Sequence, residues 1–408
     1  MNPTKVLILT ADAGFGHRST SNAIRQALSL RHGETVEVTI VNPLDDSTAL
    51  SFLRGAENDY DKLAREWTQF YRLGYKMMDL RLTTNVTEMA YVMMMYETMS
   101  RLVKHYEPDV VVVTFPTYQY PIAAQRRLGG RYYPIVTVVT DLVSLHKMWF
   151  SQVADLCLVP TEIAAQRAFN RGLTPDAVHV TGLPVNPELA AAPVSKAAAR
   201  RALGWPEDKF TVLAVGSNRI EGLEDFTHVL NHSGFDVHLV AVAGGSQRLY
   251  TALQTEEWHI PTTIYNFVDD MPRLMHAADC ILSKAGGLIV TESLACGLPL
   301  IIMKIIPGQE IGNAQYVVAE GAGDVALEPL SFLETMAHWL TNDRQLYRER
   351  VANAVRLGRP QAAFDAAELI WQAAQGGVPI RPSRFHISKE KLKTLLRQFG
   401  GSDKPINV

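Results

Sequence analysis

Hydrophobic and polar positions along this chain alternate between two kinds of segment. Short runs rich in β-branched residues, such as Val6–Thr10 and Val36–Val41, are followed by segments with helical spacing, such as Ser19–Leu30. The runs are apolar at consecutive positions, which is typical of strands covered on both faces, so the pattern predicts parallel sheets with helices on each side. Further strands are predicted at Asp109–Thr114, Ile135–Thr140, Leu156–Val159, Val178–Thr181, Phe210–Val215, Val237–Ala243, Thr263–Tyr265, Cys280–Ser283, Leu300–Met303 and Val325–Leu327.

An alanine-rich stretch that begins near residue 189 divides this pattern into two similar halves. The sequence therefore predicts an α/β protein with two doubly wound, Rossmann-like domains, at residues 1–188 and 189–375, and a tail at 376–408. Ligands of such sheets bind beyond the carboxyl ends of the strands, and two such domains place the main cleft between them.

Residues 50–106 interrupt the first half with a stretch dense in aromatic residues and methionines, and no strand is evident there. Two interpretations remain open. The stretch can form helices that pack into the core, or it can offer an adaptable apolar surface to a lipid acceptor.

Composition excludes several classes of protein. The chain has 408 residues, of which 47% are hydrophobic and 20% charged, with a net charge of −3, so a disordered chain and a nucleic-acid-binding protein are both disfavoured. The three cysteines have no metal-binding spacing and indicate free thiols in a reducing compartment. No apolar run is long enough to span a bilayer, and the amino-terminal run is too short for a signal peptide, which favours a cytoplasmic protein.

The tail differs from the rest of the chain in its charge. Residues 376–408 hold seven basic and two acidic residues, a local charge of +5. Leu392, Leu395, Leu396 and Phe399 recur at helical spacing among lysines, which predicts a basic amphipathic helix. Such a helix can lie on an anionic membrane, or it can pack back onto the domains.

The first candidate site follows the first strand, where Gly14, Gly16 and His17 open a helix. Glycines allow a tight turn and a close backbone approach to a ligand, and the helix start offers free N–H groups. The helix dipole disfavours a charged His17, so a neutral imidazole that acts as a general base is one interpretation. A capping or packing histidine is the other. A dinucleotide site is not indicated, because Ser19 stands where a third glycine is needed.

A second candidate site follows the strand that ends at Thr140. Asp141 lies at a strand's carboxyl end, and His146 and Trp149 are three residues apart, on one face of a helix if the stretch is helical. An aromatic ring beside polar groups can hold a sugar or a glycerol backbone. The alternative role for Asp141 is that of a helix cap.

The third candidate site carries the clearest signal. A strand ends at Ser283, and Gly286 and Gly287 then open a helix whose amino end suits a diphosphate. Glu292, about a turn and a half into that helix, can accept hydrogen bonds from two ribose hydroxyls.

The next loop adds further polar groups to this third site. Gln309 and Glu310 are an amide and a carboxylate side by side, which suits several sugar hydroxyls, and Asn313 follows. Two more glycine turns end strands of the second half and can line the same diphosphate pocket; they contain Gly216, Ser217 and Gly244. The D-x-D pattern at Asp59–Asp61 lies in a helical stretch rather than after a strand, and we interpret it as chance.

Together these segments resemble glycosyltransferase family 28, in particular the monogalactosyl- and glucosyldiacylglycerol synthases. The resemblance rests on the G-x-G-H-R-S turn, on T-D…H-x-x-W-F, and on S-K-A-G-G…T-E-S…G-L-P…P-G-Q-E…N-A. It covers most of residues 4–375.

The resemblance implies a GT-B fold, a UDP-hexose donor in the second half, a diacylglycerol acceptor held by the first half, and inverting transfer without a metal or cofactor. It also implies a peripheral enzyme on the inner face of the cell membrane. By resemblance His17 is the base, Glu292 binds ribose, and Gln309 and Glu310 hold the hexose. Phe15 departs from the small residue often found in the family's glycine turn, which implies a narrower acceptor entrance. Gly287-Leu288 departs from the small residues of plant members, so the donor hexose stays open. The alternatives are N-acetylglucosaminyl transfer to a lipid-linked muropeptide, a UDP-sugar 2-epimerase and a non-catalytic sugar-nucleotide sensor.

Overall fold

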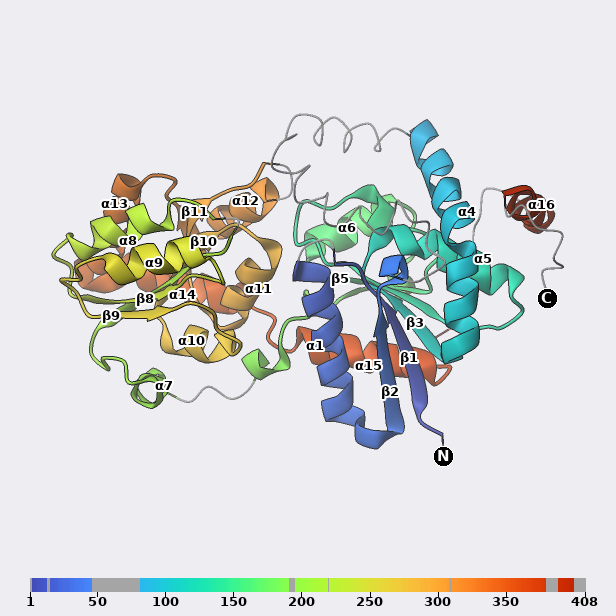
Figure 1. The fold of residues 1–408 in the computed structure, drawn as a ribbon, viewed down its shortest axis with the longest axis horizontal. Helices are drawn as coiled ribbons and strands as arrows, with labels where there is room; N and C mark the ends of the chain where they lie inside the picture. Colours follow the sequence, from blue (N-terminus) through green and yellow to red (C-terminus); the bar gives the residue numbers. More distant parts are fainter. Residues whose placement is uncertain are drawn as a thin grey trace. The chain divides into compact units, whose positions relative to one another are not determined.

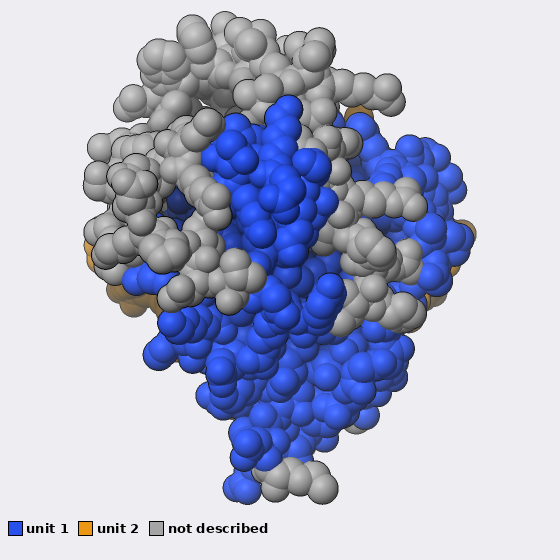
Figure 2. All heavy atoms as spheres, turned by 90° about the vertical axis from the view of Figure 1, so that its right-hand side faces the viewer, with its two compact units in different colours: residues 1–185, 361–408 blue, residues 186–360 orange. Residues whose placement is uncertain are grey.

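The chain folds into two compact units, each built on its own parallel sheet of six strands. In the computed structural model, unit 1 comprises residues 1–185 and 361–408, and unit 2 comprises residues 186–360 (Figures 1 and 2). The structure describes residues 2–12, 15–45, 81–190, 195–218, 220–307, 310–378 and 388–399.

The sheet of unit 1 has the strand order β2-β1-β3-β4-β5-β6, and every neighbouring pair is parallel. Its strands are β1 (Thr4–Leu9), β2 (Val36–Val41), β3 (Val110–Val113), β4 (Ile135–Val138), β5 (Leu156–Val159) and β6 (Val178–Val180). The order reverses between β1 and β3. Such a reversal opens a crevice at the carboxyl ends of the two strands.

Helices cover both faces of this sheet, which explains why its strands are apolar at consecutive positions. Val6 and Ile8 of β1 pack in a cluster with α1 and α15, whereas Leu7 and Leu9 pack with α4 and α5 on the other face. The helices among the described residues of unit 1 are α1 (Phe15–His32), α4 (Arg81–Tyr106), α5 (Gln119–Leu128), α6 (Glu162–Asn170), α15 (Ala362–Ala374) and α16 (Lys389–Phe399). The short 3₁₀ turns of unit 1 are η1 (Gly33–Thr35), η2 (Pro43–Asp45), η3 (Pro116–Tyr118), η4 (Lys147–Trp149) and η5 (Pro175–Ala177).

Helix α15 lies in unit 1, although the sequence assigned residues up to 375 to the second domain. Its buried face carries Ala363, Ala366 and Ile370, which join Ala23 and Ala27 of α1 over the first sheet. The two helices α1 and α15 lie beside each other in Figure 1. Small side chains on both helices allow this packing. The chain therefore crosses from unit 1 to unit 2 and returns at residue 361.

Two segments with open interpretations can now be placed in part. In α4, Met95 and Met99 are fully buried against the first sheet, so this part of residues 50–106 forms core; residues 46–80 lie outside the described ranges. In α16, Leu392 and Leu396 are buried against Val92 and Leu128 of α4 and α5. Leu392 and Leu396 of the tail helix thus pack on the rest of unit 1 rather than facing outward.

The sheet of unit 2 has the order β12-β11-β10-β7-β8-β9 and is also parallel throughout. Counted from its first strand, this is the 3-2-1-4-5-6 order of dinucleotide-binding folds, with the reversal between β7 and β10. Its strands are β7 (Phe210–Val215), β8 (Val237–Val242), β9 (Thr262–Tyr265), β10 (Cys280–Lys284), β11 (Leu300–Lys304) and β12 (Gly323–Val325).

Helices also flank the sheet of unit 2, and its core contains the large side chains of Phe210, Phe226, Phe332 and Trp339. Its helices are α7 (Lys196–Leu203), α8 (Leu223–Asn231), α9 (Gln247–Thr255), α10 (Met271–Ala277), α11 (Gly287–Ala295), α12 (Ile311–Ala319), α13 (Pro329–Leu340) and α14 (Gln345–Leu357), with 3₁₀ turns η6 (Pro187–Ala190) and η7 (Asn342–Arg344). In the described parts of both units, no helix is long and apolar enough to cross a membrane.

Candidate functional site

His17 lies at the strand-order reversal of the first sheet. Helix α1 begins at Phe15, earlier than predicted, so His17 is in its first turn. The Nδ1 atom is 2.9 Å from the carbonyl oxygen of Thr114, just beyond β3, and 2.7 Å from the hydroxyl of Thr140, just beyond β4. A carbonyl oxygen can only accept, so Nδ1 carries the proton of a neutral ring and Nε2 keeps a lone pair.

Burial sets the protonation state of His17. It lowers the pKa of the imidazole to about 4, and the Thr114 carbonyl opposes this only in part. Phe115 meets the ring edge-on at 5.1 Å between centroids, and the ring of Trp149 lies 6.2 Å away. The ring is therefore neutral at physiological pH, and Nε2 can accept a proton.

An ion pair closes the turn that leads into α1. Arg18 donates to both carboxylate oxygens of Asp12 at 2.8 and 2.7 Å, and this pairing holds the pKa of Asp12 below its usual value. The amide of Asn42 also donates to Asp12. Gly16 has open space where a side chain would project, whereas Gly14 lies outside the described residues.

Asp141 and Trp149 form a second polar contact in unit 1. The indole Nε1 of Trp149 donates to Asp141 Oδ2 at 2.7 Å, and Trp149 is buried. Burial raises the pKa of Asp141 to about 6, although the indole hydrogen bond lowers it. Asp141 does not cap a regular helix, and its partner is eight residues ahead in η4.

His146 instead serves as the cap of η4, where Nδ1 accepts the backbone N–H of Met148. The structure thus brings His17, Asp141 and Trp149 together and gives His146 a structural role beside them. Sequence reasoning missed Thr114 and Thr140, which orient His17. Their position at the carboxyl ends of β3 and β4 was the available signal.

In unit 2, two glycine turns touch at the carboxyl edge of the sheet. Gly244 has a positive φ of 60°, and a Cβ atom there would lie 2.2 Å from the carbonyl oxygen of Gly216. A Cβ on Gly216 would itself lie 2.4 Å from a methyl group of Leu249. Only glycine allows the two backbone segments to lie this close. The turns after β7 and β8 therefore form one surface, and the β7 turn continues into Ser217.

The helix start after β10 lies at the reversal in the order of the second sheet. Gly286 is the N-cap of α11, and Gly287 is its first residue. Ser283 at the end of β10 donates to the carbonyl of Val215 at the end of β7, 3.3 Å away. The free N–H groups of α11 therefore open beside the β7 turn, where an anionic group can bind.

Glu310 is held by two partners within unit 2. It is 6% exposed; one carboxylate oxygen pairs with Lys284 and the other accepts the backbone N–H of Ile306 at 2.9 Å. A Cβ on Gly286 would lie 2.6 Å from Lys284 Nζ, so the lysine of this ion pair lies directly beside the N-cap of α11. The pair places a lysine, which sequence reasoning missed, at the predicted diphosphate position.

Asn313 lies in the first turn of α12 and is buried. Its amide nitrogen donates to the carbonyl of Ala285 at 3.0 Å, and its Oδ1 has no partner among the described residues. That oxygen is a buried acceptor without a partner, beside the loop that leads into α11. Gln309, the other residue predicted to hold a hexose, lies outside the described ranges.

Glu292 is a partly buried carboxyl group of α11. Burial raises its pKa to about 7, and no hydrogen bond or ion pair holds it in the described part of the chain. A carboxylate without a partner is costly to bury, and donors such as ribose hydroxyls would offset that cost. The raised pKa therefore fits a binding role for Glu292.

The described parts of the site contain no set of metal ligands. Among all described residues, one group combines histidine and acidic side chains at metal-binding distances. It consists of His228, His232 and Glu256, which lie outside the candidate site. The Asp59–Asp61 pattern lies outside the described residues.

Known proteins match the chain along most of its length. Residues 17–185 match the family model for monogalactosyldiacylglycerol (MGDG) synthase, and residues 215–353 match that for the glycosyltransferase family 28 C-terminal domain. A curated relative, the probable monogalactosyldiacylglycerol synthase 2 (chloroplastic) of Oryza sativa subsp. japonica, is 31% identical over 91% of this chain and 81% of its own length.

Solved structures with low identity share the fold. MurG of Acinetobacter baumannii is 16% identical with a TM-score of 0.58, covering 91% of this chain and 100% of its own. The UDP-GlcNAc 2-epimerase of Neisseria meningitidis is 15% identical with a TM-score of 0.57, covering 90% and 100%. The predicted GT-B class is confirmed. Because transferases and an epimerase share this fold, the fold alone does not choose between them.

Proposed function

Because the chain belongs to the monogalactosyldiacylglycerol synthase family and is thus a glycosyltransferase, we propose that it transfers galactose from UDP-galactose to 1,2-diacylglycerol. The observation that carries the proposal is the 31% identity to a relative of that name over 91% of this chain. The relative's name supplies galactose and diacylglycerol. The nucleotide, the inversion and the absence of a metal are our further proposals.

Unit 2 is proposed to hold the donor. The β7 and β8 turns and the start of α11 supply backbone N–H groups for the diphosphate, and Glu292 accepts from the ribose. Lys284 adds a positive charge near the start of α11, where the leaving diphosphate needs stabilisation. Asn313 Oδ1 offers an acceptor to a sugar hydroxyl.

Unit 1 is proposed to bind the acceptor through His17, Gly16 and the Asp141–Trp149 pair. His17 Nε2 takes the proton of the glycerol hydroxyl as its oxygen bonds to the anomeric carbon. The bond between that carbon and the diphosphate breaks, and its electron pair leaves with UDP. A single displacement of this kind inverts the anomeric centre, and we propose that it proceeds without a metal.

A lipid acceptor places the reaction at a membrane surface. We propose that the protein is peripheral there, on the inner face of the cell membrane, with anionic lipids as the binding surface. The described helices hold no candidate span, and the basic residues of α16 supply positive charge.

One assay tests the proposal. The purified protein is incubated with vesicles that contain either diacylglycerol or a lipid-linked muropeptide and with UDP-galactose, UDP-glucose or UDP-N-acetylglucosamine, with and without EDTA, and calorimetry measures UDP-sugar binding in parallel. We expect a galactolipid with a β-anomeric signal by NMR, and equal rates with EDTA. A glucolipid as the sole product would mean that the donor is UDP-glucose and not UDP-galactose. A sugar transferred only to a muropeptide lipid, UDP released without lipid product, or UDP-sugar binding without turnover would each overturn the proposal.

A further inference from the structure

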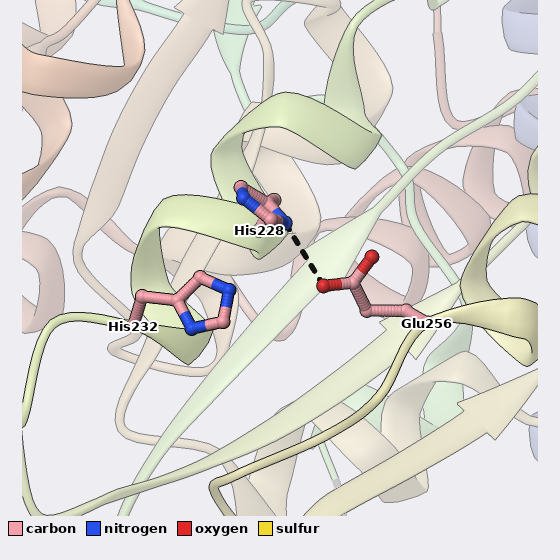
Figure 3. A group of neighbouring side chains, drawn as sticks. All are labelled: His228, His232 and Glu256. Carbon is pink, nitrogen blue, oxygen red and sulfur yellow. Dashed lines mark hydrogen bonds and ion pairs between the residues drawn. The ribbon is translucent and has the colours of Figure 1, made fainter.

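The carboxyl end of α8 carries a group of side chains that the proposed transfer does not use. His228, His232 and Glu256 each offer one ligand atom, and these atoms all lie within 4.8 Å of one another. In Figure 3, His228 and Glu256 point toward one another, with Nδ1 and Oε1 2.9 Å apart, and His232 lies beside them. The two histidines are exposed at the surface of unit 2.

The helix sets the spacing of the two imidazoles. His228 lies in the last turn of α8, and His232 is its C-cap with near-helical angles, φ −101° and ψ 6°. Residues four apart on a helix lie on the same side, one turn from each other, and paired histidines at this spacing bind transition metals. Glu256, the residue after α9, supplies a carboxylate from a second element.

A buried asparagine fixes the position of this second element. The amide of Asn231 donates to the carbonyl of Glu257 at 2.7 Å, and its Oδ1 accepts the backbone N–H of His259 at 2.7 Å. The segment that carries Glu256 is therefore held against the end of α8. The same contact brings the His259 ring to 5.1 Å from that of His232, between centroids.

The ligand set suits zinc. Zinc binds imidazole nitrogen and carboxylate oxygen at roughly 2.0–2.2 Å, so ligand atoms of a tetrahedral site lie about 3.4 Å apart. Rotation of exposed side chains closes the separations of up to 4.8 Å seen here. Water or His259 completes the tetrahedron. Helices α8 and α9 both end at this point, and the negative ends of their dipoles favour a cation.

We propose that His228, His232 and Glu256 form a surface site for a divalent transition-metal ion of the zinc type. The ion joins the end of α8 to the connection between α9 and β9. In a parallel sheet the helices run back against the strands, so this site lies at the amino edge of the sheet, opposite the β7 and β8 turns. The ion therefore acts on the structure of unit 2 and not on the transferred sugar.

The test uses the full-length protein without a polyhistidine tag, dialysed against EDTA and then freed of chelator. Calorimetric titration with ZnCl₂ is expected to show one ion per chain, and Zn²⁺ is expected to raise the melting temperature. Either His232→Ala or Glu256→Gln should weaken binding at least tenfold, as expected for the loss of a ligand. His338→Ala removes an exposed histidine of α13 in the same unit and should leave binding unchanged.

Cobalt separates this site from the cysteines. A Co²⁺ complex of the proposed ligands gives tetrahedral visible bands without the sulfur charge-transfer band that Cys296 would add. Melting curves in EDTA confirm that the variants fold. Binding that is absent in the wild type, equal in His232→Ala, or accompanied by a sulfur band would overturn the proposal. So would a loss of transfer activity in His232→Ala, because the site lies away from the donor turns.

Discussion

The Nδ1 atom of His17 and the carbonyl oxygen of Thr114 lie 2.9 Å apart, across the reversal in strand order of the first sheet. A backbone group therefore fixes the tautomer of this histidine, where many catalytic histidines use a carboxylate. The backbone cannot neutralise an imidazolium as a carboxylate can, which agrees with the depressed pKa of about 4.

The first prediction is that His17→Ala lowers kcat by about 10²–10⁴-fold, because the glycerol hydroxyl loses its proton acceptor. UDP affinity should change little, since the base serves the acceptor. Radiolabelled transfer to diacylglycerol vesicles measures kcat, and calorimetry measures the Kd of UDP. A rate within a few-fold of the wild type would make Asp141 the better candidate for the base.

The pH profile separates these two candidates. At saturating donor, kcat/KM for the acceptor should stay flat down to about pH 5 if His17, with a pKa of about 4, is the base. If Asp141 is the base, the rate should fall below about pH 6, where that carboxyl becomes protonated. Saturation with donor keeps the titration of Glu292 out of the profile.

The second prediction is that Glu292→Gln weakens UDP binding and stabilises the free protein. Loss of charge-assisted hydrogen bonds to ribose should cost about 1.5–3 kcal/mol of binding free energy, or roughly 10–150-fold in Kd. The folded pKa of about 7 lies above the usual value of 4.5, so the wild type loses stability as pH rises from 4.5 to 7. Glutamine removes that loss.

Two measurements check this prediction. Denaturant unfolding at pH 8 should show the variant more stable by about 1–3 kcal/mol, with the gain vanishing near pH 4.5. Calorimetry should show that UDP affinity of the wild type, relative to the variant, falls as the pH drops below 7. The control Glu334→Gln changes an exposed glutamate of α13. An unchanged Kd for UDP would exclude the ribose assignment.

Eleven of the twelve described strands coincide closely with predicted runs, because helices cover both faces of the sheets and most strands are apolar at consecutive positions. The last strand, β12 (Gly323–Val325), shares only Val325 with the predicted run Val325–Leu327, since its sequence Gly-Asp-Val is not continuously apolar. The unit to which α15 belongs was not predictable. Its face of Ala363, Ala366 and Ile370 would suit either sheet, and only the packing against α1 decides between them. An amphipathic pattern shows that a helix is covered, but it does not identify the partner.

The positions of candidate residues were predictable where the residue follows a strand along the chain, as for His17, Asp141 and Glu292, whose roles stay predictions. The site was not predictable where a group acts through a distant partner. The hydrogen bond from His17 to the Thr114 carbonyl depends on the order of the strands in the sheet. A contact with a backbone carbonyl leaves no recognisable residue type in the sequence. Glu310 suggested a sugar ligand, but its partner Lys284 is 26 residues earlier and is brought close only by the β10–β11 pairing.

The third prediction concerns the contact between two glycine turns of unit 2. Gly244→Ala should lower UDP affinity and stability together, because the new methyl group would lie 2.2 Å from the Gly216 carbonyl oxygen. The matched control is Gly204→Ala, whose φ of 71° is similar but which has nothing within 4 Å. The control should show only the backbone strain of about 1–2 kcal/mol and bind UDP normally. Equal effects of the two variants on UDP binding would contradict a donor role for this contact.

The fourth prediction separates packing from charge in α16. Leu392 is fully buried against α4 and α5, so Leu392→Ala should lower the free energy of unfolding of unit 1 by about 2–4 kcal/mol. Replacing Lys389, Lys391 and Lys393 by glutamine should leave stability nearly unchanged, since Lys389 and Lys391 are exposed. It should instead weaken sedimentation with anionic vesicles at low salt far more than at high salt, because each cation contributes about 1 kcal/mol at such a surface and salt screens it. The two variants thus test two faces of one helix. If the triple lysine variant sediments like the wild type at low salt, α16 is a packing element alone, and membrane contact must come from another part of the chain.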